Sequence, residues 1–268
     1  MPEIPNFISE TAVVQKNEPI AQGVYLMRLH APRLATASRP AQFLQILTDP
    51  GLSPYLRRPF SVLRADREAG WLDLIYDVIG PGTERLSSAQ CGDPFDVSGP
   101  LGNPFAPPKT KRILLVAGGV GLVPLAFLAW EHPDRRPDMI YLMGAANTAR
   151  LPDMSALLPT DLPIHIATDD GSIGHRGFVT ELIAEHTLPN HTTILTCGPH
   201  PMMARVAHIA AELNAPCYAS LENHMACGFG ACVGCVVEYK TYPTEDRRYR
   251  CVCLEGPVIN AHEIVWGD

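Results

Sequence analysis

Five of the eight cysteines of this 268-residue sequence fall in one late stretch. Cysteine thiolates bind soft metals and iron–sulfur clusters, and a late cluster in a chain without an export signal indicates metal binding rather than a disulfide framework. The segment MPEIPNFISE at the N-terminus is acidic and interrupted by prolines, which is unlike a secretory signal. We therefore expect a metal-binding protein of the cytoplasm. The five residues are Cys227, Cys232, Cys235, Cys251 and Cys253.

The first three cysteines have the spacing C-x4-C-x2-C, and a later cysteine follows them. This is the spacing of plant-type [2Fe–2S] sites. Gly228, Gly230 and Gly234 let a loop wrap a compact inorganic core with its N–H groups directed at sulfur. A structural zinc ion also takes four thiolates, but zinc sites usually pair their cysteines in two short knuckles. Three ligands in one glycine-rich loop favour iron–sulfur.

The fourth cluster ligand is ambiguous from the pattern. Cys251 and Cys253 are two residues apart. In an extended strand both side chains would point to the same face, so periodicity leaves both open.

Two earlier segments have the residue types that hold a flavin nucleotide. Arg58–Ser61 opens an expected strand, where an arginine fork can bind phosphate and a serine can hydrogen-bond the flavin ring. Gly80–Thr83 is a turn that opens a short helix, and its backbone N–H groups can approach a pyrophosphate. Taken alone, each segment is more typical of a surface charge or a simple turn. Their order before a nucleotide-binding pattern favours the flavin.

Three segments at expected strand ends are typical of a nicotinamide site. A glycine loop with Gly118, Gly119 and Gly121 lies between a strand and a helix. It allows close approach to phosphate, although it lacks the full dinucleotide fingerprint. The other two segments contain Asp170 and Cys197-Gly198-Pro199. A cysteine such as Cys197 is more commonly a core residue, but its place at a strand end before Gly-Pro favours the nicotinamide pocket.

The stretch after the second strand of this region predicts which nicotinamide is used. Residues 144–148 contain no basic side chain, and Arg150 is the first that follows. A 2′-phosphate is normally bound by a nearby arginine. The sequence therefore predicts NADH rather than NADPH.

The elements that must position these residues fall into three expected domains: 1–108, 109–221 and 222–268. In the first, short apolar runs separated by Pro/Gly turns predict an antiparallel β barrel or sandwich, which contains the flavin segments and is the expected FAD-binding domain. In the second, strands alternate with helices, which predicts a doubly wound parallel sheet, and this region contains the segments expected to bind NAD. The third is a small [2Fe–2S]-binding subdomain that is too short for a large core, so bound metal would stabilise it. Pro104–Pro108 is an expected linker.

The expected strands and helices are short. In the first domain the strands are Gly23–Leu29, Ala41–Leu47, Phe60–Leu63, Leu72–Ile79 and Pro94–Ser98. In the second they are Ile113–Ala117, Met139–Met143, Pro163–Ala167, Thr193–Cys197 and Cys217–Ser220, with helices at Leu122–Trp130, Phe178–His186 and His200–Leu213.

Charge and hydropathy argue against two classes of partner. The net charge is −7 and none of the three regions is basic, so the electrostatic signature of a nucleic-acid-binding protein is missing. Ile113 to Trp130 is uncharged and long enough to be examined as a membrane span. Its internal glycines and Pro124 fit a strand, a turn and a helix start better. We expect neither nucleic acid nor membrane as a partner.

Taken in order, the motifs resemble the ferredoxin–NADP reductase superfamily and, more closely, the electron-transfer subunits of NAD-dependent (class 1B type) bacterial dihydroorotate dehydrogenases. The resemblance covers nearly the whole chain. Its most specific part is the cysteine loop together with the last cysteine motif. The matching segments are Arg58–Ser61, Ile75-Tyr76, Gly80–Thr83, Gly99–Asn103, Gly118–Gly121, Asp170–Ser172, Cys197–Pro199, Pro201–Met203, Ser220–Glu222, Met225–Gly228, Gly230–Cys232, Cys235 and Cys253–Val258.

The resemblance implies specific ligands. It selects Cys253 as the fourth cluster ligand and leaves Cys251 as a spare thiol. It implies FAD contacts at Arg58, Pro59, Phe60, Ser61, Ile75, Tyr76, Asp77, Gly82 and Thr83. Phe60 stands where the superfamily has Tyr and this family a small aliphatic residue, and Asp77 stands where the family usually has Arg. An acid cannot pair with pyrophosphate, so Asp77 is the weakest of these contacts.

The expected function is electron transfer from NADH through FAD and a [2Fe–2S] cluster, with no catalytic acid or base in this chain. NADH gives up two electrons as a hydride and a cluster accepts one at a time, so a flavin must lie between them. The resemblance implies a partner, an FMN-containing catalytic dehydrogenase subunit of pyrimidine biosynthesis, in a heterotetramer with two copies of each chain. The alternatives are the same kind of subunit in an electron-bifurcating ferredoxin–NADP oxidoreductase, hydrogenase or sulfide dehydrogenase, or a zinc-stabilised binding module.

Overall fold

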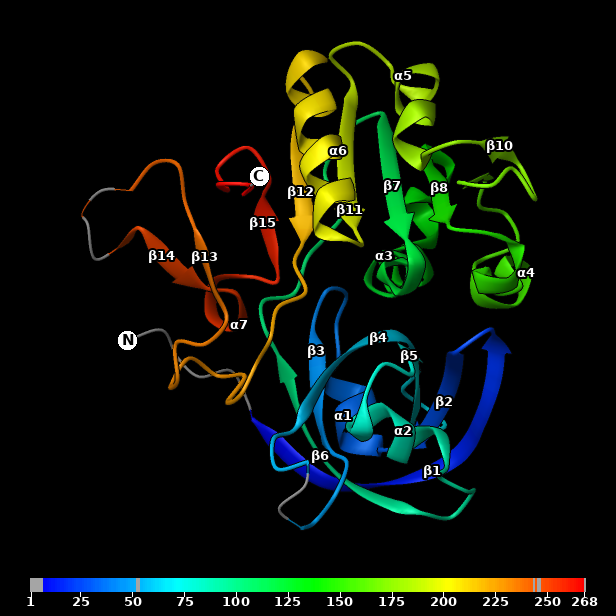
Figure 1. Cartoon of the computed structure of the whole chain (residues 1–268), viewed down its shortest axis with the longest axis vertical. Coiled ribbons are helices and arrows are strands. Elements are labelled where there is room, and N and C mark those ends of the chain that lie inside the picture. The colour runs from blue at the N-terminus through cyan, green and yellow to red at the C-terminus, as the bar shows by residue number, and fades with distance from the viewer. Residues whose placement is uncertain (1–6, 52–53, 243, 245–246, 268) are drawn as a thin grey trace.

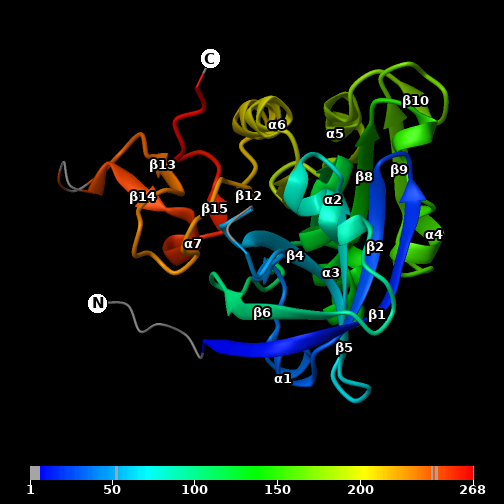
Figure 2. The same ribbon diagram turned by 60° about the horizontal axis from the view of Figure 1, so that its bottom comes forward.

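The computed structural model describes residues 7–51, 54–242, 244 and 247–267, so the first six residues of the acidic N-terminal segment lie outside it. A barrel forms the lower part of Figure 1, and a sheet covered by helices forms the upper part. The cysteine-rich segment lies to one side of both in Figures 1 and 2.

Six antiparallel strands close the barrel in the order β1-β2-β5-β4-β3-β6. The expected barrel is thus confirmed, but the sequence analysis missed β1, a long strand whose middle is polar and mostly solvent-exposed. Two short helices, α1 (Pro32–Ala37) and α2 (Pro81–Ser87), lie in its connections. The strands are β1 (Ile8–Ala21), β2 (Val24–His30), β3 (Phe43–Leu47), β4 (Arg58–Asp66), β5 (Trp71–Asp77) and β6 (Pro94–Leu101).

The second region is a seven-stranded sheet in the order β10-β9-β8-β7-β11-β12-β15. All its pairings are parallel except that of β15 with β12. The strands are β7 (Arg112–Gly118), β8 (Met139–Ala145), β9 (Ile164–Thr168), β10 (His175–Arg176), β11 (Thr192–Cys197), β12 (Cys217–Ser220) and β15 (Val258–Asn260). The helices are η1 (Gly119–Gly121), α3 (Leu122–Glu131), η2 (Pro133–Asp138), η3 (Thr148–Arg150), α4 (Met154–Leu157), η4 (Val179–Leu182), α5 (Ile183–His186) and α6 (His200–Glu212).

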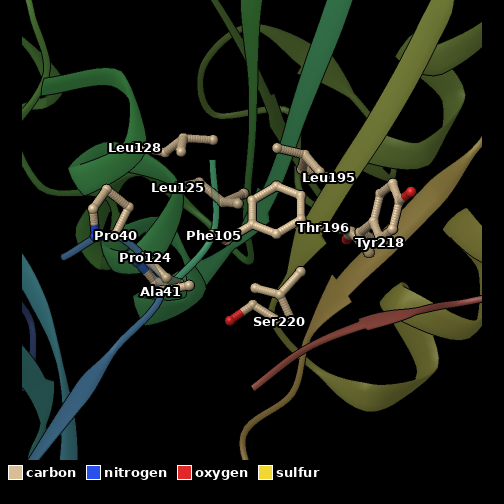
Figure 3. A pocket seen from close by; sticks show the side chains of 11 residues that line it. Pro40, Ala41, Phe105, Pro124, Leu125, Leu128, Leu195, Thr196, Tyr218 and Ser220 are labelled. Atoms are coloured by element: carbon tan, nitrogen blue, oxygen red, sulfur yellow. The ribbon is translucent and has the colours of Figure 1, made fainter. Parts of the chain in front are cut away.

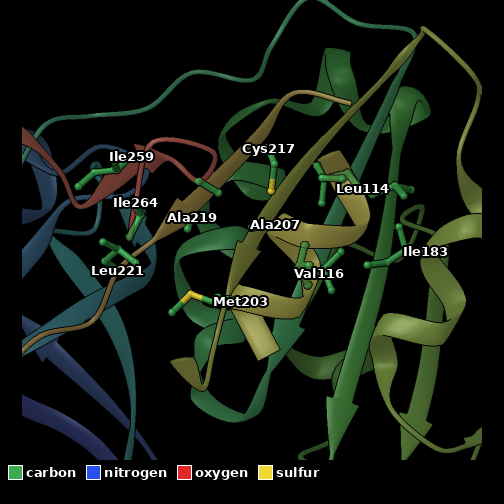
Figure 4. Packing of buried hydrophobic residues seen from close by; sticks show 14 of the residues in the cluster. Leu114, Val116, Ile183, Met203, Ala207, Cys217, Ala219, Leu221, Ile259 and Ile264 are labelled. Carbon is green, nitrogen blue, oxygen red and sulfur yellow. The ribbon is translucent and has the colours of Figure 1, made fainter. Parts of the chain in front are cut away.

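Helices cover both faces of this sheet. Successive residues of the central strand β7 are apolar and pack against helices on opposite faces. Ile113 and Leu115 pack in the core under α3, whereas Leu114 and Val116 pack in the core under α6. Figure 4 shows Leu114 and Val116 directed towards Ala207 of α6 and Ile183. A strand buried on both sides must be apolar throughout, as the run in β7 is. The expected doubly wound arrangement is confirmed.

The segment after residue 222 shares this core. Its strand β15 adds to the sheet edge, and Ile259 and Ile264 pack with Leu221 and Ala219 (Figure 4). It also contains a small hairpin and one helical turn. These elements are β13 (Val236–Glu238), β14 (Tyr249–Cys251) and α7 (Val252–Glu255). The seven-stranded sheet therefore contributes to holding the cysteine-rich segment.

The uncharged stretch from Ile113 to Trp130 divides into β7, η1 and α3, as its glycines predict. Among the helices of the described residues, none has the length and hydropathy needed to cross a membrane.

The barrel and the sheet meet at α3. Phe127 of α3 is fully buried in the barrel core, and α3 lies beside β4 in Figures 1 and 2. The expected linker is packed into this junction, because Phe105 lies 5.4 Å from Tyr218 between ring centroids. Figure 3 shows Phe105 between Leu125 and Tyr218, beside a cavity of about 10 Å³.

Candidate cofactor sites

The cysteine loop occupies residues 227–235, between β12 and β13. Gly228 and Gly230 have positive φ angles of 77° and 87°, which favour glycine. Chain folding brings the loop onto the barrel at Gly228 and onto the α7 turn at Gly230, whose added Cβ would lie 2.6 Å from Leu254 Cγ. Gly228 and Gly230, which were expected to let the loop wrap a cluster, therefore also allow close contact of the loop with the barrel and with α7.

The first two thiols of the loop form a pair. The Sγ of Cys227 accepts hydrogen bonds from the N–H groups of Ala231 at 3.2 Å and Cys232 at 3.4 Å. Hydrogen bonds with the backbone of Cys227 and Gly234 lower the pKa of the Cys232 thiol to about 7. N–H groups directed at sulfur stabilise the thiolate, which is the form that binds metal.

The second pair joins the end of the loop to α7. Cys235 and Cys253 are buried, and the N–H of Cys253 donates to Cys235 Sγ at 3.5 Å. The hydrogen bond between their thiols lowers the pKa of Cys235 to about 6 and raises that of Cys253. The half-buried thiol of Cys251 also contacts Cys235. The structure thus brings both candidate fourth ligands to Cys235.

The premise of an extended strand through both candidates is wrong. Cys251 ends β14, whereas Cys253 lies in the first turn of α7. The alternation of side chains along a strand therefore does not relate Cys251 to Cys253. Cys253 Sγ also interacts with the backbone of Gly230 in the cysteine loop.

The donor set suits a dinuclear centre. Within the described ranges, no group of three or more His, Cys, Asp or Glu side chains is gathered closely enough to hold one metal ion. The thiols stand instead as the pairs Cys227/Cys232 and Cys235/Cys253, with Cys251 also in contact with Cys235. A [2Fe–2S] core takes four thiolates, two on each tetrahedral iron. Two pairs with backbone N–H donors fit that requirement.

The two flavin segments meet in space. The guanidinium of Arg58 on β4 lies over Gly82 of α2, where an added Cβ would be 2.9 Å from Nε. Arg58 also donates to the carbonyl oxygen of Leu56. The Thr83 hydroxyl accepts the N–H of Ile79 at 3.0 Å and donates to the Gly80 carbonyl at 3.1 Å. Gly82 thus leaves room for the Arg58 guanidinium. The hydrogen bonds of Thr83 stabilise the turn that contains Gly82.

Two other expected flavin residues pack in the barrel core. Phe60 and Tyr76 are 8% and 3% exposed, and their rings meet edge to face at 5.8 Å. The Tyr76 hydroxyl donates to Asn17 Oδ1 at 2.9 Å. Pro59 and Ser61 alternate with Phe60 and are half-buried, and Ile75 is buried on the side of the seven-stranded sheet.

Asp77 of β5 joins the barrel to the helical turn η3 that follows β8. Its carboxylate pairs with Arg150 of η3 at 2.6 Å. Arg150 also donates to the Gln22 carbonyl at 2.7 Å. An acid at this position therefore has a partner that the sequence analysis did not anticipate, because the two residues are 73 positions apart.

The glycine loop and the Cys197 segment lie backbone to backbone. Strands β7 and β11 are neighbours, with Ala117 opposite Cys197. A Cβ at Gly121 would lie 2.6 Å from Gly198 N. One at Gly118 would lie 2.9 Å from Pro199 Cδ, whereas Gly119 faces open space. These residues therefore form one surface at the carboxyl end of the sheet, where nucleotides bind in open α/β folds.

Asp170 lies further along the same edge, beyond β8. It accepts the Ser172 N–H at 2.9 Å, and Ser172 Oγ accepts the Thr148 N–H at 2.8 Å. Hydrogen bonds from the hydroxyl and the backbone N–H of Ser172 lower the pKa of Asp170. The structure thus joins Asp170 to the loop after β8 rather than directly to Gly118–Gly121.

The Cys197 thiol is fully buried, and burial raises its pKa well above the ordinary value. Its Sγ lies 3.9 Å from the carboxylate of Glu222, just after β12. Glu222 was not selected as a site residue. Its position could have indicated a role, because Glu222 is a charged residue directly after the strand next to β11, at the edge of the sheet where ligands bind in open α/β folds.

A closed antiparallel barrel, in which Arg58 lies over Gly82, joined to a mostly parallel sheet covered by helices, defines a ferredoxin–NADP reductase-like fold. A solved NADH-dependent reduced ferredoxin–NADP oxidoreductase, described for flavin-based electron bifurcation, matches with a TM-score of 0.84 at 27% identity, over 95% of this chain and 90% of that one. A ferredoxin NADP⁺ reductase from Neisseria gonorrhoeae with bound FAD and NADP has the same fold, with a TM-score of 0.65 at 17% identity, over 81% and 94%.

Within this class, the relatives identify the family. The electron transfer subunit of dihydroorotate dehydrogenase B (NAD(+)) from Geobacillus kaustophilus is 36% identical over 96% of this chain and 98% of its own. That from Desulforamulus reducens is 34% identical over 92% and 94%. Residues 222–265 match the iron–sulfur cluster binding domain of dihydroorotate dehydrogenase B. The chain belongs to the family of dihydroorotate dehydrogenase B electron transfer subunits, and the expected resemblance is confirmed.

Proposed function

We propose that this chain carries electrons from NADH, through FAD on the barrel and a [2Fe–2S] cluster in the cysteine loop, to the catalytic subunit of dihydroorotate dehydrogenase in pyrimidine biosynthesis. When bound, FAD accepts a hydride and gives up electrons singly, and the cluster carries single electrons. The three proposed units are residues 1–108, 109–221 and 222–268, for FAD, NAD and the cluster respectively.

The contacts of the barrel are the observation that carries this proposal. On one side the barrel meets the nucleotide sheet through Phe127 and the Asp77–Arg150 pair. On another it meets the cysteine-rich segment, because the Asn103 N–H donates to the Gly256 carbonyl at 2.7 Å. A flavin held on the barrel would therefore lie between the nicotinamide and the cluster, which is the order that the chemistry requires.

Each proposed site has its own residues. Arg58, Gly82 and Thr83 would hold the FAD phosphates, with Pro59, Phe60, Ser61, Ile75, Tyr76 and Asp77 lining or supporting the flavin side of the barrel. Gly118, Gly119, Gly121, Cys197, Gly198, Pro199 and Asp170 would receive NAD(H). Cys227, Cys232, Cys235 and Cys253 would bind the cluster. We assign no catalytic acid or base to this chain, and the high pKa of the buried Cys197 thiol keeps it neutral near pH 7.

Family membership implies a catalytic partner subunit, and we propose that it carries FMN and assembles with this chain as two copies of each. The cytoplasm is the proposed compartment. All eight cysteines are free thiols in the structure, as cluster ligands must be before metal binds.

Cofactor content tests the proposal directly. We expect the anaerobically purified chain to contain one FAD and one [2Fe–2S] per polypeptide, with an iron–sulfur EPR signal after reduction. Mixed with the catalytic subunit, it should support reduction of that subunit by NADH. A colourless zinc protein would instead indicate the binding-module alternative. A loaded protein that reduces ferredoxin but not the catalytic subunit would indicate the bifurcating alternative.

Nicotinamide preference is a second expected result. The first basic residue after β8 is Arg150, and its guanidinium is already bound by Asp77 and the Gln22 carbonyl. It is therefore not free for a 2′-phosphate. We expect kcat/KM for NADH to exceed that for NADPH by at least about tenfold, equivalent to ~1.4 kcal/mol. Stopped-flow reduction of the bound FAD measures the ratio without the partner, and equal values would refute the prediction.

A further inference from the structure

Gln45, a buried residue of the barrel, has a side-chain amide nitrogen without a hydrogen-bond partner among the described residues. Gln45 lies on β3 and is 1% exposed. Its neighbours Leu44 and Ile46 point into the barrel core. Because side chains alternate along a strand, Gln45 points outwards, on the same face as Phe43. Phe43 packs in the core that also holds Cys235 and Cys253. Gln45 therefore lies between the barrel and the cysteine-rich segment.

The cysteine loop closes directly over this amide. A Cβ added to Gly228 would overlap Gln45, lying 2.8 Å from its Cδ, and would also be 3.1 Å from Leu101 Cδ1. Gly228 has a φ of 77° and follows Cys227 in the chain. The loop backbone next to the first proposed ligand is thus in contact with the Gln45 side chain, with apolar Leu101 as the other neighbour.

The amide nitrogen of Gln45 is buried and has no hydrogen-bond partner among the described residues. An unpaired buried donor is unfavourable, so such groups normally face an acceptor in the working protein. Gln42, three residues earlier, shows the usual situation. It accepts the Arg39 N–H at 3.0 Å and donates to the Gly102 carbonyl at 3.0 Å.

We propose that the Gln45 amide donates a hydrogen bond to a sulfur of the iron–sulfur centre bound by the cysteine loop, and that it raises the reduction potential of that centre; this rests on the proposed function. Sulfur ligands and bridging sulfides accept N–H hydrogen bonds, and such bonds favour the more negative, reduced state. The loop supplies backbone donors at Ala231 and Cys232, and Gln45 supplies one from the barrel. Gln45 is therefore a positioning residue that links the flavin-binding domain to the cluster.

The test compares Gln45→Met with Gln42→Met in the full chain reconstituted with FAD and iron–sulfur. Gln45→Met keeps the side-chain length but removes the donor. We expect the cluster midpoint potential to shift to a more negative value in EPR-monitored titration, with the FAD potential unchanged. Gln42→Met removes an amide bonded elsewhere, so it should lower thermal stability and leave the cluster potential unchanged. In the cluster-free protein, Gln45→Met should not lower Tm, because it removes an unpaired donor.

A second measurement does not depend on a variant folding. Pulsed ENDOR on the reduced wild-type cluster, with ¹⁵N-labelled glutamine side chains, should detect a coupled exchangeable proton and the amide nitrogen. Absence of that coupling, or equal cluster potentials in wild type and Gln45→Met, would overturn the inference while leaving the cluster itself established. A wild-type protein that binds no cluster would contradict the proposed function as well, so the two failures are distinguishable.

Discussion

Cys253→Ser is expected to lose or severely alter the iron–sulfur cluster while FAD binding survives. Cys253 is 3% exposed, and its N–H donates to Cys235 Sγ at 3.5 Å. The next residue, Leu254, packs on Gly230 of the cysteine loop. A serine there keeps the fold but replaces a soft thiolate by a harder oxygen ligand, which iron–sulfur centres rarely use. NADH oxidation by an artificial two-electron acceptor should persist, and reduction of the catalytic subunit should fail.

Cys251→Ser is the matched control. Cys251 also contacts Cys235, but it ends β14, is half-buried and pairs through its backbone with Val236. We expect its cluster spectrum, iron content and electron delivery to match those of the wild type. A native spectrum in Cys253→Ser together with cluster loss in Cys251→Ser would reverse the ligand assignment. Full electron delivery to the partner without any cluster would reject the proposed route.

Arg58→Ala is expected to release FAD. The Arg58 guanidinium lies over Gly82, which joins the two proposed phosphate-binding segments. Removing a charge-assisted hydrogen bond costs roughly 1.5–3 kcal/mol. That corresponds to FAD affinity weaker by about 10- to 150-fold. Flavin occupancy after gel filtration and the Kd from fluorescence quenching measure the effect, while circular dichroism checks that the barrel is intact.

Arg57→Ala is the control for Arg58→Ala, because it removes a neighbouring positive charge that is not expected to contact FAD. Arg57 is the preceding residue and pairs with Asp96 at 2.6 Å at the barrel surface. Losing that exposed ion pair should change stability by at most about 1 kcal/mol and leave FAD binding unchanged. If Arg58→Ala retains flavin as well as Arg57→Ala does, Arg58 is only a surface charge.

The strands of the nucleotide sheet were largely predictable because their signals are local. The apolar run of β7 and the helical spacing in α6 are determined by neighbouring residues, and Cys217–Ser220 was predicted with the bounds it has in the structure. By contrast, β1 is polar through its middle, and β15 has only three residues. β1 is a strand because it pairs with β2, which follows it directly, and with the distant strand β6. β15 is a strand because the distant strand β12 pairs with it.

What the sequence by itself determined was the type of chemistry: the spacing of the cysteines, the glycine loop at a strand end, and the order of barrel, nucleotide sheet and cysteine loop. What only the tertiary structure decided was which distant groups meet. It brings Arg58 onto Gly82, couples Asp77 to Arg150, and lays the backbone of Gly228 over Gln45. The spacing of residues along the chain predicts contacts only within a turn or a strand. The three contacts above depend instead on how the barrel closes and on how the barrel, the sheet and the cysteine loop pack together.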